Sequence, residues 1–133
     1  MQDTVEKFGP LVGRILIALI FLLSGFGKIT GYAGTAGYMA SKGVPMVDLL
    51  LPITIVIEFG GALMIIAGYK ARLAALALLL WMIPVTIIFH NFWAVPAEQA
   101  MIQQIMFLKN ISIMGAMLYI MAFGSGPLSV DKK

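Results

Sequence analysis

Apolar residues gather into four long runs along this chain. A helix that crosses the ~30 Å hydrocarbon core of a bilayer needs about 20 mostly apolar residues. Four runs fit that requirement, and they cover residues 11–27, 49–68, 73–93 and 102–123. No Ala-x-Ala-like cleavage site closely follows the first run, and Lys28 closes it, which indicates a retained helix rather than a signal peptide. The pattern predicts four transmembrane helices.

The connections between the runs are short. Residues 32–42 are mostly small and are followed by Gly43 and Pro45, which predicts a short interfacial helix after the first span. Residues 69–72 form a tight basic turn and residues 94–101 a short acidic loop. The four spans leave no room for a second domain. We therefore expect residues 1–133 to form one all-α domain, an antiparallel four-helix transmembrane bundle.

Composition agrees with a membrane protein and excludes several other classes. Hydrophobic residues make up 61% of the chain and charged residues 11%, whereas about 25% of a soluble domain is charged. The nine basic residues are too few and too scattered for nucleic-acid binding. With no cysteine, the chain has no disulfide, thiolate nucleophile or iron–sulfur ligand. We expect a lipid bilayer around it and no metal site.

Three charged residues fall inside the predicted spans: Arg14, Glu58 and Lys109. A charge near the bilayer centre costs several kcal/mol, so it normally faces the bundle interior and has a partner. From the ~1.5 Å rise per residue, Glu58 and Lys109 lie at similar depths, and Arg14 reaches Glu58 from beneath. We therefore expect an interior cluster in which Glu58 pairs with Lys109 or Arg14, with His90 nearby.

Further polar residues lie around these charges. Lys28 shares a helix face with Arg14, and Thr86 precedes His90 by one turn. Asn91 and Asn110 are expected to cap or cross-link helices. Two interpretations stay open at this point: the cluster binds a ligand, or its ion pair only fixes helix register. His90 taken alone is more typical of a packing residue.

The distribution of basic residues predicts the orientation. Four spans place both termini on one side of the membrane, together with the turn at residues 69–72. That side has six basic residues and the opposite side three; the six are Lys7, Arg14, Lys70, Arg72, Lys132 and Lys133. Because basic residues are enriched in cytoplasmic segments, we expect both termini in the cytoplasm.

The order of these features resembles the DoxX family of small four-helix bacterial membrane proteins. The resemblance lies in GRILIALIFLLSGFGKITG (residues 13–31), YMASKGVP (38–45), IEFGGALMIIAGYKARLAAL (57–76), IIFHNFW (87–93) and QIMFLKNISIMGAML (104–118). It covers nearly the whole chain and implies a bacterial inner-membrane location. It also implies a link to quinone-dependent oxidoreduction, to detoxifying enzymes or to membrane-protein assembly. The recurring polar positions of the family coincide with Arg14, Lys28, Glu58, His90 and Lys109, and no catalytic role comes with them.

Two functions follow as hypotheses. In the first, the chain is a small subunit of a membrane redox assembly that binds a quinone or quinol. Lys109, Arg14 and His90 would donate to quinone oxygens, and Glu58 would orient them or move protons. In the second, it is a non-catalytic assembly or scaffold protein with a structural ion-pair core. No residue here is suited to hold a redox metal, so the first hypothesis requires a protein partner or a bound quinone. A membrane protein partner or a second copy of the chain is expected in both.

Overall fold

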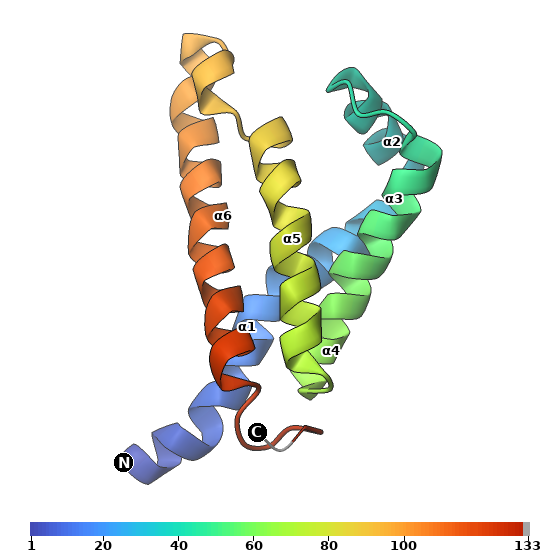
Figure 1. Cartoon of the computed structure of the whole chain (residues 1–133). Helices are drawn as coiled ribbons and strands as arrows, with labels where there is room; N and C mark the ends of the chain where they lie inside the picture. Colours follow the sequence, from blue (N-terminus) through green and yellow to red (C-terminus); the bar gives the residue numbers. More distant parts are fainter. Residues whose placement is uncertain (132–133) are drawn as a thin grey trace.

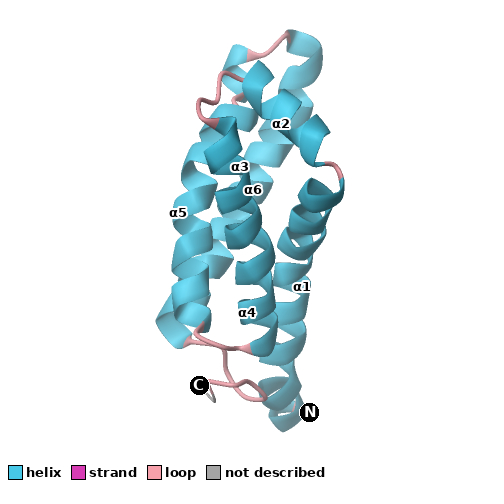
Figure 2. Ribbon diagram, turned by 90° about the vertical axis from the view of Figure 1, so that its right-hand side faces the viewer, coloured by secondary structure: helices cyan, strands magenta, loops and turns pink. Residues whose placement is uncertain are grey.

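The computed structural model describes residues 1–131, and it is helical along nearly all of them (Figures 1 and 2). Four helical segments in this range are long and apolar enough to cross a membrane. The first is α1 (Gln2–Thr30). The second comprises α3 (Val47–Ile55), the π-helix η1 (Val56–Gly60) and α4 (Gly61–Ala67). The third is α5 (Ala71–Phe89) and the fourth α6 (Ala97–Phe123).

The four predicted spans are confirmed. A short helix, α2 (Tyr32–Ser41), follows the first span as expected, and a 3₁₀ turn, η2 (Phe92–Ala94), separates α5 from α6. The largest difference lies at the start of α1, which begins at Gln2 rather than at residue 11. Hydropathy marks only the part of a helix that lipid surrounds, and here polar residues continue the same helix beyond that part.

The helices form two layers that diverge. α5 packs along α6, α1 packs along η1 and α4, and the contact between α4 and α5 joins the two layers. Figure 1 shows the layers close together at the end that carries both termini and apart at the end that carries α2. This divergence positions the candidate site.

The closely packed core lies in the half near the termini. Its buried residues are mostly small or unbranched at Cβ, and they include Ala18, Ala62, Ala74, Ala75, Leu78 and Met117. Small side chains let membrane helices approach closely, which is how such interfaces gain packing energy without a hydrophobic driving force. Gly61 illustrates this, because a Cβ there would lie 3.2 Å from the Leu78 side chain.

Arg14 holds this half together through backbone carbonyls. Its side chain is buried, and its Nε donates to Ile65 O at 3.0 Å. Nη2 donates to Ile66 O at 3.4 Å; these two carbonyls belong to the last turn of α4, where intrahelical partners are missing. The guanidinium also donates to the C-terminal segment, residues 124–131, which follows α6. The acceptors there are Ser125 O (2.6 Å), Pro127 O (3.3 Å) and Leu128 O (2.9 Å). One side chain therefore ties α1, α4 and that segment together.

The expected cluster of Arg14 with Glu58 is therefore wrong. Depth along a helix gave the height of Arg14 but not the direction of its side chain. Carbonyls of the last turn of α4 and of the C-terminal segment accept hydrogen bonds from all three guanidinium nitrogens. The C-terminal segment adds a second tie, because the Asp131 carboxylate accepts from the N–H groups of Lys70 and Ala71 at the start of α5.

Replacing Arg14 should lower thermal stability in proportion to the hydrogen bonds lost. Hydrogen bonds to a charged group contribute about 1.5–3 kcal/mol each, and those to Ile65 O and Ser125 O are the buried ones, so we expect Arg14→Met to lose roughly 3–6 kcal/mol. Arg14→Lys should fall between Arg14→Met and the wild type, because an ammonium keeps the charge without the planar fork. Thermal melts in detergent micelles measure this, with Lys7→Met on the exposed start of α1 as control. Equal melting of Arg14→Met and Lys7→Met would contradict the assignment.

Candidate intramembrane cavity

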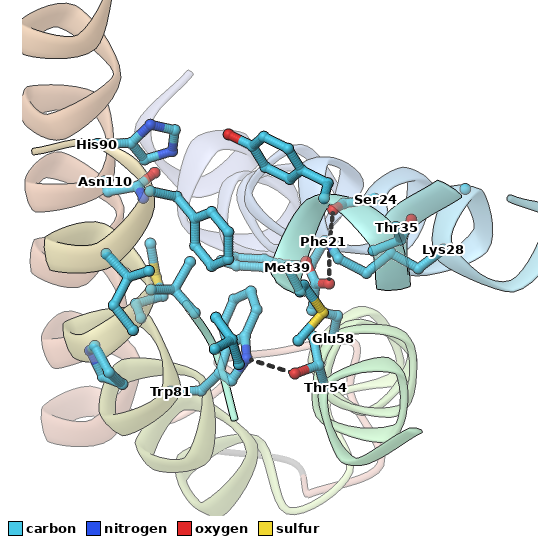
Figure 3. A pocket seen from close by; sticks show the side chains of 18 of the residues that line it. Phe21, Ser24, Lys28, Thr35, Met39, Thr54, Glu58, Trp81, His90 and Asn110 are labelled. Atoms are coloured by element: carbon cyan, nitrogen blue, oxygen red, sulfur yellow. Dashed lines mark hydrogen bonds and ion pairs between the residues drawn. The ribbon is translucent and has the colours of Figure 1, made fainter. Parts of the chain in front are cut away.

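A cavity of about 790 Å³ lies where the two layers diverge. Its walls come from α1, α2, the second span, α5 and α6, and it brings together five of the eight polar residues singled out from the sequence: Lys28, Glu58, His90, Lys109 and Asn110. Arg14 lies in the other half of the bundle, and Thr86 and Asn91 stand outside the lining. Figure 3 shows Lys28 and Glu58 on one side of the cavity and His90 and Asn110 on the other.

Glu58 pairs with Lys28 and not with either predicted cation. Lys28 Nζ lies 2.6 Å from Glu58 Oε1 and donates to Ser24 Oγ at 2.8 Å. The Glu58 side chain is 3% exposed and that of Lys28 23%. Side chains on a helix tilt toward its N-terminus, which for Lys28 is the direction into the bundle. Its long stem therefore reaches from the end of α1 to a carboxylate at the middle of the second span.

The π-helix η1 places Glu58 against α1. π-helical turns are rare; they occur mostly within α-helices and are frequent at functional sites. Beside Glu58, Phe59 meets Gly25 of α1, where an added Cβ would lie 3.0 Å from both Phe59 Cβ and Phe59 N. Only a glycine allows this approach without displacing backbone. The close contact of α1 with η1 keeps the Lys28–Glu58 pair within reach.

The opposite wall carries hydrogen-bonding side chains held by the α5–α6 pair. His90 Nδ1 lies 2.9 Å from Gln103 Oε1, and Asn110 Nδ2 donates to Thr86 Oγ1 at 3.0 Å. Asn110 thus cross-links α6 to α5, as expected from the sequence. Gln103, which the sequence did not single out as a partner, fixes the imidazole ring.

Lys109 has no partner within the described chain. Residues 1–131 provide it with no ion pair, hydrogen bond or cation–π contact. It lies near the middle of the 27-residue α6 and lines the cavity. On insertion scales, a lysine at the centre of a membrane helix costs about 2.5–3.5 kcal/mol. The predicted Glu58–Lys109 pair is wrong, because Lys28 forms the ion pair with Glu58.

Aromatic side chains line the cavity between the two polar walls. Trp81 packs edge-on against Phe21, with ring centroids 6.4 Å apart, and its Nε1 donates to Thr54 Oγ1 at 3.3 Å. Tyr38 of α2 stacks on Phe89 at the end of α5, with centroids 5.5 Å apart. Trp81 and Tyr38 were missed from the sequence. The signal available in the sequence was Thr54, one turn before Glu58, because its hydroxyl accepts the hydrogen bond from Trp81.

The fold and the cavity define a four-span α-helical membrane protein with a polar intramembrane site. The family model described as DoxX matches residues 9–91, a range that includes Lys28, Glu58 and His90. The chain belongs to the DoxX family.

The chain is also similar to curated proteins, two of them inner membrane proteins. The chain is 39% identical over 128 residues to the inner membrane protein YqjF of Escherichia coli, a match covering 96% of this chain and 93% of that protein. It is 36% identical over 123 residues to the inner membrane protein YphA of the same organism, covering 92% and 88%. A Surfeit locus protein 4 homolog of Schizosaccharomyces pombe is 29% identical over 136 residues, covering 99% of this chain and 39% of that protein. No solved structure gave a significant match.

A double-mutant cycle distinguishes the observed ion pair from the expected one. Glu58→Gln and Lys28→Met should each lower the free energy of unfolding, with a coupling of about 1–2 kcal/mol. That value lies between the small coupling of interhelical polar contacts in membranes and the larger loss in buried soluble pairs. Glu58→Gln and Lys109→Met should instead be additive within about 0.5 kcal/mol. Coupling of Glu58 to Lys109 but not to Lys28 would overturn this pairing.

Proposed function

We propose that this protein is a small membrane subunit that binds the head group of a quinone or quinol in the intramembrane cavity. The observation that carries the proposal is the arrangement of two polar walls across an aromatic gap (Figure 3). A quinone has the complementary form, a flat apolar ring with an oxygen at each end. A volume of about 790 Å³ lies within the range typical of sites for small molecules and cofactors.

Each wall offers both hydrogen-bond donors and hydrogen-bond acceptors. Lys28 supplies a donor and Glu58 an acceptor on one side. On the other side Lys109 is a donor, and His90 is fixed through its Nδ1. When Nδ1 donates to Gln103 Oε1, Nε2 of the neutral ring is an acceptor for a quinol hydroxyl. Arg14 is not among the proposed quinone-binding residues, because its guanidinium donates its hydrogen bonds to backbone carbonyls.

The chain's share of the chemistry is then binding and proton handling. Glu58 accepts a proton from a hydroxyl on its side of the ring, and Lys28 stabilises the carboxylate between such events. The electrons pass to or from a partner protein in the membrane that carries the redox centre. The alternative, a non-catalytic assembly protein, uses the same ion pair for register only and needs no ligand.

We place both termini in the cytoplasm. They lie at the same end of the bundle as the Lys70–Arg72 turn (Figure 1). Lys7, Lys70 and Arg72 lie at that end, and Lys42 lies in the loop beyond α2 at the opposite end. Lys132 and Lys133, which also entered the charge count, lie outside the described residues.

Filling the cavity should abolish quinone binding without unfolding the bundle. Gly27 lines the cavity, and a Cβ there would meet nothing within 4 Å, so Gly27→Phe places a ring at the site without backbone strain. Gly13→Phe on the same helix is the matched control, because its Cβ also meets nothing within 4 Å and it does not line the cavity. Protein extracted in mild detergent is assayed for co-purifying quinone by mass spectrometry, alongside thermal melts.

We expect the wild type and Gly13→Phe to retain quinone and Gly27→Phe to lose most of it at an unchanged melting temperature. Equal amounts of quinone in both variants would show that the quinone does not bind in this cavity. Absence of quinone from the wild type after saturating supply would remove the redox-subunit proposal and leave the assembly protein.

Single introduced cysteines test the orientation without background labelling, because the chain has no cysteine of its own. A membrane-impermeant maleimide applied to intact cells should label Lys42→Cys and Glu98→Cys and leave Lys70→Cys unlabelled until the cells are opened. Labelling of Lys70→Cys in intact cells, with positions 42 and 98 protected, would reverse the orientation.

A further inference from the structure

The described residues that line the cavity include two lysines, Lys28 and Lys109, but one carboxylate, that of Glu58. Lys28 and Glu58 cancel as an ion pair at 2.6 Å. Glu58 is the only acidic residue among the described lining residues, so Lys109 on the far wall faces no second carboxylate. The imidazole of His90 adds no negative charge, and Asn110 is neutral and hydrogen-bonded to Thr86. The cavity therefore has a positive imbalance at the α6 wall.

An ammonium group without a partner is costly in a low-dielectric site, and it is stabilised by a negative charge within hydrogen-bond distance. Residues 1–131 contribute no such charge at Lys109. A ligand that enters with one anionic oxygen supplies it. Most of the remaining lining is apolar or aromatic, which suits an apolar body behind that oxygen.

We propose that the cavity binds its ligand as an anion, with one negatively charged oxygen on an apolar body placed against Lys109. This inference rests on the proposed function, since it specifies the ionisation state of the head group held in the same cavity. An acidic hydroxyl on a quinone ring meets this chemistry, and so does the carboxylate of a fatty acid. The Lys28–Glu58 wall then holds the neutral end of the ring.

A matched pair of probes tests the charge. A 2-hydroxy-3-alkyl-1,4-naphthoquinone is an anion at neutral pH, and its 2-methoxy ether is neutral with nearly the same shape. Trp81 lines the cavity and Trp93 does not, so a Trp93→Phe background reports binding through quenching of Trp81 fluorescence. Laurate is the third probe, and its binding is read as displacement of the hydroxynaphthoquinone.

In this background we expect the anion to bind roughly 10- to 150-fold more tightly than the ether, the value of one charge-assisted hydrogen bond. Lys109→Met should abolish that preference and Lys109→Arg should retain it, with Lys7→Met unchanged as the control for net charge. Because Lys109 has no partner among residues 1–131, Lys109→Met should not lower the melting temperature.

The outcomes separate the two proposals. Equal affinity for anion and ether, or a preference that survives Lys109→Met, overturns the inference while leaving a quinone site in place. Binding of neither naphthoquinone overturns the inference and the quinone proposal together. If laurate displaces the hydroxynaphthoquinone with equal affinity and depends on Lys109 in the same way, the anionic site is supported. Its ligand is then a fatty acid and not a quinone.

Discussion

An ion pair buried in the membrane constrains the whole arrangement. Glu58 lies at the middle of the second span with only 2% of its surface exposed, and Lys28 of α1 supplies its counter-charge. Separating the two would leave a bare charge in hydrocarbon, so α1 must stay against η1 along this part of the bundle. Gly25 permits that contact, and the π-helical turn directs the carboxylate toward it. Among residues 1–131 no ion pair holds α5 and α6 to the other layer. The two layers diverge at the end that carries α2, and the cavity lies between them.

Arg14 and Lys28, two of the three cations on α1, share one helix face but act in different ways. Arg14 is held by carbonyls of α4 and the C-terminal segment and closes the half near the termini. Lys28 is held by a carboxylate and borders the cavity. Each belongs to the contact between α1 and the second span. With both engaged there, Lys109 on α6 is the cation within the spans that has no partner among residues 1–131.

The spans and the short helix after the first were predictable from the sequence, because hydropathy and length alone determine which segments a bilayer accepts. Five of the polar residues that line the cavity were also predictable, since intramembrane polar groups face the bundle interior. Their pairing was not. Depth along each helix cannot say whether Lys28 points inward, and nothing in the composition marks the π-helical turn at Val56–Gly60 or the return of residues 124–131 to Arg14. Those depend on tertiary contacts between distant segments.

Magic-angle-spinning NMR of the protein in lipid bilayers tests the central claim most directly, with ¹⁵N on the lysine ammonium groups and ¹³C on the glutamate carboxylates. We expect a strong through-space correlation between Lys28 Nζ and the Glu58 carboxylate and none between Lys109 Nζ and any protein carboxylate. A correlation of Glu58 with Lys109 in place of Lys28 would contradict the pairing that opens the cavity, and with it the free cation at its wall.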